Sequence, residues 1–166
     1  LSQLLFAGQG MRGNGNKLLA PSAQEQYPLV TYVVASNVSD IDIGLYQFEN
    51  RGHALKRVDS DPVSTFSFSN QLEDAAIGNQ PWIKNAAAII IIAGNIASLN
   101  DHFCDQPPVN KRGERYNYIE VGAVSQNIQL QATALSLGMV LVGGFDNDKV
   151  KSILNLPSEL EPSALL

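Results

Sequence analysis

The most constraining feature of the sequence is the apolar run AAAIIIIA at residues 86–93, which contains four consecutive isoleucines. The run is far shorter than the roughly 20 residues that a membrane-spanning helix requires. A strand-length segment without a polar side is stable only where both of its faces are covered. We therefore predict that residues 88–93 form a buried strand in the centre of a sheet, and we expect no membrane span.

A second strong pattern spans Tyr116–Leu137, where apolar or small side chains recur every three or four residues before Gly138. This spacing predicts an amphipathic helix that stops at the glycine. At 1.5 Å per residue the helix is about 33 Å long, which is the span of a whole domain. Its many small residues suit close packing on more than one side, so we expect a central or subunit-interface helix.

Shorter patterns predict the remaining elements, which mix strands and helices without a regular βαβ rhythm. The turn at Asn50-Arg51-Gly52 predicts a hairpin, and residues 95–113 are expected to form a loop of the kind that often covers an active site. The predicted class is α+β, a mixed sheet flanked by helices. The elements are a helix at Ser2–Gln9 closed by Gly10, strands at Leu29–Ala35, Gly44–Phe48 and Ala54–Val58, a helix at Gln71–Ile77, a strand at Met139–Val142, and a helix from the cap Asp146 through Leu154.

The composition fits a single globular domain, residues 1–166, with a small charged surface, because 45% of the residues are apolar and only 16% are charged. Such a chain often hides part of its surface in an oligomer. The net charge is −5, and the lysines and arginines are scattered except around Lys111, Arg112 and Arg115. A nucleic-acid partner needs a basic stripe, so we expect none.

The single cysteine, Cys104, cannot form a disulfide within the chain, and no Cys/His cluster has the spacing of metal ligands. Both features suit a reducing compartment, so we expect a cytoplasmic protein with no metal site. The chain opens at Leu1 without an initiator methionine or a signal-peptide pattern, and we expect further residues upstream. His53 and His102 are expected to be solvated side chains, and Cys104 to be inert.

Two turns are candidates for ligand binding. Pro21-Ser22-Ala23 follows a glycine-rich loop, where a hydroxyl and backbone N–H groups could bind a polar ring or a phosphate; Ser22 capping a turn is the alternative. In Val142-Gly143-Gly144-Phe145 a predicted strand leads into two glycines, which permit close approach of a flat ligand. Backbone amides there could donate to an atom that gains negative charge on reduction. A plain turn needs one of these glycines but not both.

The long helix carries a third candidate group. Gln126 and Asn127 need hydrogen-bond partners if they are buried, and a ring edge rich in nitrogen and oxygen would provide them. The two side chains could equally tie down neighbouring loops. Glu120 lies one helical step beyond Arg115 and Tyr116, so we expect its carboxylate to form an ion pair within the helix or between subunits.

Six segments, taken in chain order, carry a family resemblance that covers nearly the whole chain. Together they resemble the nitroreductase superfamily, and within it the SagB-type branch. A single such motif means little, whereas six in family order are specific. The segments are Leu1–Gly10; Ala20–Ala23 with Tyr27–Leu29; Gly44–Tyr46 with His53–Leu55; Trp82–Ile83; Glu120–Ala123 with Gln126–Asn127; and Gly143–Asp146.

The resemblance implies an oxidoreductase that is a homodimer with FMN at the subunit interface. NAD(P)H or another donor would reduce the flavin, and a small-molecule substrate would reoxidise it in ping-pong fashion. By this resemblance, Ser22, Ala23 and Gln24 contact the isoalloxazine ring, and the backbone of Gly143 and Gly144 lies beside flavin N5 and O4. The flavin carries out the hydride chemistry while the protein orients it and stabilises the reduced anion.

The resemblance also leaves roles and substrates open. Gln126 and Asn127 belong to the same motif set without an assigned atom. Branch members that oxidise peptide azolines share a Lys-Tyr pair before the long helix; this chain has Lys111-Arg112 there, so Lys111 could retain a proton-transfer role. The main hypothesis is NAD(P)H-linked reduction or dehydrogenation of a small conjugated substrate. The alternatives are a SagB-type peptide azoline dehydrogenase and a non-catalytic flavin-binding module.

Overall fold

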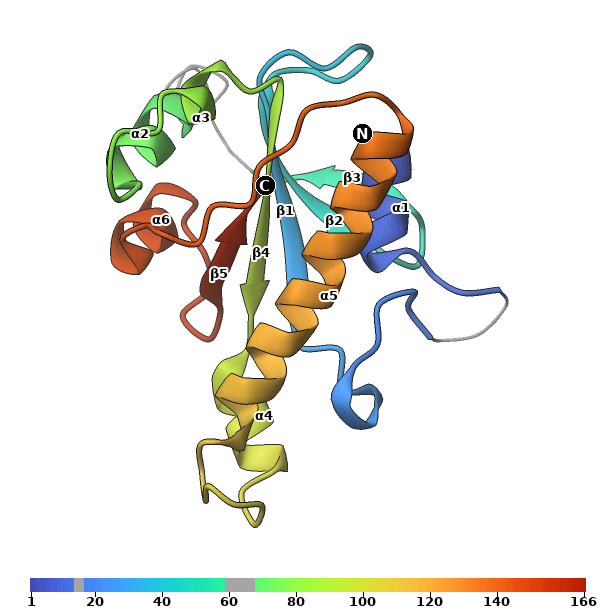
Figure 1. Cartoon of the computed structure of the whole chain (residues 1–166), viewed down its shortest axis with the longest axis vertical. Helices are drawn as coiled ribbons and strands as arrows, with labels where there is room; N and C mark the ends of the chain where they lie inside the picture. Colours follow the sequence, from blue (N-terminus) through green and yellow to red (C-terminus); the bar gives the residue numbers. More distant parts are fainter. Residues whose placement is uncertain (14–16, 59–67) are drawn as a thin grey trace.

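A five-stranded sheet forms the centre of the structure, a computed structural model that describes residues 1–13, 17–58 and 68–166 (Figure 1). The strands follow the order β3-β2-β1-β4-β5. The α+β class is confirmed, and every pairing between these strands is antiparallel rather than a mixture of directions. The bounds are β1 Leu29–Ala35, β2 Gly44–Glu49, β3 Ala54–Arg57, β4 Ala88–Gly94 and β5 Glu161–Leu165.

The isoleucine run forms β4, as predicted, and β4 lies inside the sheet between β1 and β5. Ile89 and Ile91 join the hydrophobic cluster on one face of the sheet, whereas Ile90 and Ile92 join the cluster on the other. All four side chains are buried. The strand can be apolar throughout because helices cover both of its faces.

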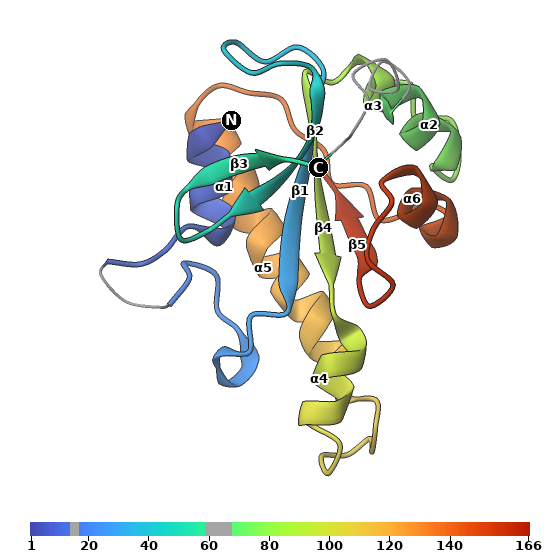
Figure 2. The same cartoon turned by 180° about the vertical axis from the view of Figure 1, so that it is seen from behind.

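The helices divide between the two faces of the sheet (Figures 1 and 2). α1 and the long helix α5 pack together over one face, and α2, α3 and α6 lie over the other. α4 extends past the end of the sheet and packs on α5. The bounds are α1 Ser2–Gln9, α2 Phe68–Ala75, α3 Trp82–Asn85, α4 Ile96–His102, α5 Arg112–Ala134 and α6 Asn147–Ile153, with a 3-10 turn, η1, at Ala23–Glu25.

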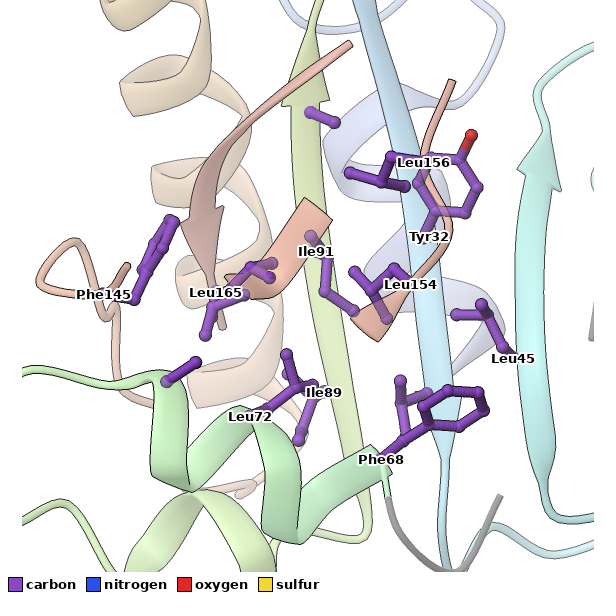
Figure 3. Close-up of a cluster of buried hydrophobic side chains, with 14 of the residues drawn as sticks. Tyr32, Leu45, Phe68, Leu72, Ile89, Ile91, Phe145, Leu154, Leu156 and Leu165 are labelled. Carbon is purple, nitrogen blue, oxygen red and sulfur yellow. The ribbon is translucent and has the colours of Figure 1, made fainter. Parts of the chain in front are cut away.

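A hydrophobic cluster stabilises each face. On the side of α2 and α6, Leu72 and Phe145 pack with Ile91 (Figure 3). On the side of α5, Val124 packs with Val33. Burying an aliphatic or aromatic side chain of this size contributes roughly 1.5–3 kcal/mol. The two clusters therefore fix α5 and the α2/α6 pair on opposite sides of the same sheet.

The predicted loop at residues 95–113 was wrong, because α4 and the first residues of α5 lie within it. Asn95 caps α4 by accepting a 2.9 Å hydrogen bond from the Ser98 backbone N–H. Leu99 of this helix and Phe103 at its C-cap are each 1% exposed. An N-cap asparagine followed by apolar residues at helical spacing is a signal that sequence analysis could have used.

The long helix is confirmed, but it begins four residues earlier and ends three residues earlier than predicted. Ser136 adopts a left-handed φ of 58°, and the Leu137 N–H donates back to the Ala132 carbonyl at 2.9 Å. This is the hydrogen-bond pattern of a Schellman C-cap, with serine where glycine is usual. The expected stop at Gly138 was therefore two residues late.

The other predicted elements are confirmed except at two places. α1 and β1 have the expected bounds, β2 and β3 form the expected hairpin, and Asp146 caps α6. α2 lies about three residues earlier than the predicted helix. The predicted strand at Met139–Val142 was wrong, because only Val142 pairs, through an isolated bridge to Leu165. β5 was not predicted, since Pro162 within it argues against a strand.

Candidate functional site

The Gly143–Gly144 turn connects the edge of the sheet to α6, and its neighbours hold it firmly. Val142 and Leu165 exchange two backbone hydrogen bonds of 2.8 and 3.0 Å on one side of the turn. On the other side, the Ile77 N–H donates to the Gly144 carbonyl at 2.8 Å. Phe145 then enters the core beside α2. The turn is thus a fixed piece of backbone on the α2/α6 side of the sheet.

The two glycines of this turn are exposed, and the fold itself does not require them. Neither has the positive φ that favours glycine. A Cβ added to Gly143 would meet no atom within 4 Å, and one added to Gly144 would meet Ile77 only at 3.7 Å. The N–H groups of both glycines donate to no described residue. The backbone of Gly143 and Gly144 therefore faces open space, and its two N–H groups are available to a flat ligand that lies against it.

The second candidate group is the Ser22 loop, which we define as residues 22–27 and which contains η1. The Ser22 hydroxyl accepts a 2.8 Å hydrogen bond from the Tyr27 N–H, so the expected turn-capping role is present. Gln24, Glu25 and Tyr27 all have left-handed φ values, of 48°, 59° and 47°. Three such residues in one short loop are uncommon outside glycine. The loop therefore has a specific shape that its contacts must maintain.

Glu120 of α5 supplies the buried contact of this loop. Its Oε1 accepts a 2.8 Å hydrogen bond from the Ala23 N–H, and the residue as a whole is 5% exposed. The expected ion pair within the helix was wrong, because Glu120 is buried and pairs with no cation among the described residues; an ion pair between subunits stays a prediction. Burial raises the pKa of Glu120, while hydrogen bonds from Ala23 and the Ser22 hydroxyl act in the opposite direction.

The other predicted site residues lie on the outer side of α5 or at its start. Gln126 is exposed and Asn127 is half-buried, so burial does not force either side chain to find a partner, and their role in binding stays a prediction. Lys111 is exposed at the N-terminal cap of α5. It precedes Glu120 by nine residues, about 13 Å along the helix axis.

The histidines have partners that the sequence did not indicate, although both are exposed as expected. His102 of α4 hydrogen-bonds through Nε2 to Oε1 of Gln24 at 3.0 Å, which links α4 to the Ser22 loop. His53 hydrogen-bonds to Ser2 at 2.7 Å and packs edge-on against Phe6. Cys104 is exposed and free. The useful signal missed by sequence analysis is therefore His102, whose neighbour Gln24 was already a candidate.

The two candidate turns lie on opposite faces of the sheet. The Ser22 loop contacts the middle of α5, and the Gly143–Gly144 turn packs beside α2 and α6. In Figure 1 the light-blue η1 lies beside the lower half of α5, with the strands between it and α6. An apolar cavity of about 770 Å³ has Trp82, Leu137 and Val142 in its lining, so it reaches the residue before the Gly143–Gly144 turn. One chain therefore does not bring the two turns together.

Comparison with known proteins agrees with this architecture. The fold defines an α+β protein built on an antiparallel sheet, with candidate ligand-binding backbone on both of its sides. The chain belongs to the nitroreductase family, whose sequence pattern matches residues 1–166. This membership places it among oxidoreductases.

Two relatives are each named "putative nitroreductase". The first, from Methanocaldococcus jannaschii, is 34% identical over 156 residues, which cover 94% of this chain and 73% of the relative. The second is a crystal structure from Anabaena variabilis, which matches with a TM-score of 0.80 and 26% identity. That match covers 99% of this chain but only 33% of the other, so this chain spans about a third of that relative's length.

A second similar structure is the Escherichia coli microcin synthetase McbBCD complex with truncated pro-MccB17 bound. It matches with a TM-score of 0.72 over 99% of this chain and 60% of the other, at 16% identity. At this identity the likeness shows the fold alone.

In the described ranges, no helix has the combination of length and apolar composition that crossing a bilayer requires. Among the same residues, no group of three His, Cys, Asp or Glu side chains could hold a metal ion.

Proposed function

We propose that this protein is an FMN-dependent oxidoreductase that takes electrons from NAD(P)H and reduces or dehydrogenates a small conjugated substrate. The observation that carries the proposal is the Gly143–Gly144 turn. Packing and backbone conformation do not explain either glycine, and neither N–H group donates to a residue that the structure describes. An isoalloxazine ring is flat and gains negative charge on reduction, so it matches bare backbone with unused donors.

The residues present fit the ring of FMN. Gly143 and Gly144 would donate their N–H groups to the ring, and Ser22, Ala23 and Gln24 would contact it from the second turn. Bound FMN would supply hydride transfer. The protein would orient the ring, exclude water from it and stabilise the reduced anion through donors that are already fixed in place.

The opposite positions of the two turns support a homodimer with FMN at the subunit interface. A ring that touches both turns requires the Ser22 loop of one subunit and the Gly143–Gly144 turn of the other. The outer side of α5 offers a surface for this contact, because Ile119 and Leu130 are about 60% and 61% exposed there. Gly122, between them, has no neighbour within 4 Å of an added Cβ. A partner subunit would cover this apolar side.

Gln126 also lies on the outer side of α5, with Asn127 next to it. At a subunit interface their amide groups would meet polar atoms of the ring or of the partner, which would supply hydrogen bonds that the described residues of one chain do not make.

We propose a cytoplasmic location on the basis of the single free cysteine. Lys111 would transfer a proton only under the alternative function, a SagB-type peptide azoline dehydrogenase.

The first experiment is an absorption spectrum of the purified protein before and after addition of FMN, followed by NADH and NADPH in separate samples. We expect a bound flavin spectrum that bleaches with a nicotinamide donor and recovers on addition of an acceptor. A protein that takes up no flavin would contradict the proposal. Flavin uptake without bleaching by either donor would favour the non-catalytic flavin-binding module, and oxidation of an azoline peptide would favour the dehydrogenase.

A further inference from the structure

Glu120 carries a carboxylate into the interior of the protein without a cation to balance it. It is 5% exposed, and none of the ion pairs in the described ranges includes it. A buried carboxylate of this kind is costly unless hydrogen-bond donors surround it. The donors that reach Glu120 come from one segment outside its own helix, the Ser22 loop: the Ala23 N–H at 2.8 Å and the Ser22 hydroxyl.

The Ser22 loop needs such an anchor. Backbone strain at non-glycine residues with left-handed φ persists only where the surroundings fix the conformation, and Gln24, Glu25 and Tyr27 all have it. The other contacts of the loop with distant segments are exposed: the ion pair of Glu25 with Lys17 and the hydrogen bond of Gln24 with His102. Exposed contacts of this kind contribute little.

We propose that Glu120 is a positioning residue that holds the Ser22 loop in the shape that binds flavin. The inference rests on the proposed function, because it takes the Ser22 loop as a wall of the flavin site. Two hydrogen bonds carry it: the Ala23 N–H donates to Glu120 at 2.8 Å, and the Tyr27 N–H donates to the Ser22 hydroxyl at 2.8 Å.

The chemistry of the side chain explains why a carboxylate serves here. An ionised carboxylate only accepts hydrogen bonds, and its two oxygens have room for both an N–H and an O–H donor. A glutamine at this position would keep one accepting oxygen for Ala23 but would present an NH₂ group to the Ser22 hydroxyl. Glu120→Gln should therefore preserve most of the anchor, and Glu120→Ala should remove it.

The test measures the loop and the flavin separately in the full-length protein. Exchange of the Ala23 amide hydrogen is followed by NMR without flavin, and FMN affinity is measured by quenching of flavin fluorescence. In Glu120→Ala we expect Ala23 to exchange about tenfold faster and the FMN dissociation constant to rise about tenfold, the factor that corresponds to ~1.4 kcal/mol. Glu120→Gln should lie between Glu120→Ala and the wild type in both measurements.

Ser125→Ala is the matched control. Ser125 is also a buried polar residue of α5, 3% exposed, but its Oγ has no hydrogen-bond partner among the described residues. Its removal should leave both the Ala23 exchange rate and the FMN affinity at wild-type values. If Glu120→Ala does not fold, Glu120→Asp withdraws the carboxylate by one methylene and should accelerate Ala23 exchange in the same direction.

The outcomes separate this inference from the proposed function. Wild-type exchange of Ala23 in both Glu120→Ala and Glu120→Asp would overturn the anchoring role, whatever the protein binds. Faster exchange with unchanged FMN affinity would overturn the link between the Ser22 loop and flavin. A wild-type protein that binds no FMN would overturn the proposed function and the flavin half of the inference, while the exchange rates would still decide whether Glu120 anchors the loop.

Discussion

The backbone N–H of Ala23 donates a 2.8 Å hydrogen bond to Oε1 of Glu120, although the two residues are 97 positions apart in the sequence. The contact joins the Ser22 loop to the middle of the longest helix. It also places a titratable group in the interior, where loss of water stabilises the neutral acid. The pH dependence of stability should therefore report on this contact.

Glu120→Gln should flatten the pH dependence of stability. Burial raises the pKa of Glu120 above its ordinary value of 4.5. Between that value and the raised pKa, the folded state binds more protons than the unfolded state, so the free energy of unfolding falls as pH rises through this window. Above the raised pKa, the free energy of unfolding has fallen by the full amount that this group contributes. Glutamine does not titrate, so the variant should gain stability relative to the wild type as pH rises.

Urea unfolding from pH 4 to pH 8 at constant ionic strength measures this difference. Ser125→Ala, which removes a side chain that does not titrate from the same helix, is the control and should give a curve parallel to the wild type. A wild-type minus Glu120→Gln difference that is constant with pH, or that grows in favour of the wild type as pH rises, would contradict the burial of an ionisable carboxylate at this position.

Gly143→Val should weaken FMN binding without loss of stability. The added side chain meets open space within the protein, so the fold tolerates it, but it occupies the surface where the ring would lie. We expect the FMN dissociation constant to rise at least about tenfold, because one hydrogen bond to the ring and its close approach are lost. Fluorescence titration measures the affinity, and urea unfolding measures the stability.

Gly138→Val is the matched control for that substitution, since Gly138 is also exposed, has no positive φ and has no atom within 4 Å of an added Cβ. Both variants should unfold at the same urea concentration as the wild type. Equal FMN affinity in the two variants would show that the Gly143–Gly144 turn does not contact the ring.

Elements with a strong local pattern could be predicted from the sequence. The isoleucine run predicts a buried strand because a strand with apolar side chains on both faces is stable only inside a covered sheet. The Asn50-Arg51-Gly52 turn predicts the hairpin of β2 and β3. Elements whose ends depend on rarer local structure could not. Ser136 ends α5 in a conformation that usually signals glycine, and β5 contains a proline that sheet interiors avoid.

The candidate site divides in the same way. Gly143 and Gly144 stand out in the sequence because a plain turn needs only one glycine, whereas Ser22 also has an ordinary turn-capping role. The role of Glu120 could not be predicted, because helical spacing placed it near Arg115 and gave no indication that the carboxylate faces the interior. Only the packing of α5 on the Ser22 loop reveals that its partner is backbone.

Leu72→Ala should destabilise the α2/α6 side of the protein. Leu72 is fully buried and packs in the cluster that contains Phe145, next to the Gly143–Gly144 turn (Figure 3). A buried leucine replaced by alanine leaves a cavity and costs about 2–5 kcal/mol of unfolding free energy. Asn70→Ala, at an exposed position of the same helix, should change it by less than about 0.5 kcal/mol. Urea unfolding distinguishes the two, and equal effects would contradict the assignment of Leu72 to the core.

Ile119→Glu should dissociate the proposed homodimer. Ile119 is 60% exposed on the outer side of α5, so a charge there is harmless in a monomer but would be buried without a partner in an apolar interface. Gln129→Glu adds the same charge to another exposed position of α5 and serves as the control. Sedimentation velocity should show a dimer for the wild type and the control, and a folded monomer for Ile119→Glu. Because the proposed flavin site takes one turn from each subunit, the monomer should also lose FMN; a monomer that keeps wild-type FMN affinity would place the whole site within one chain.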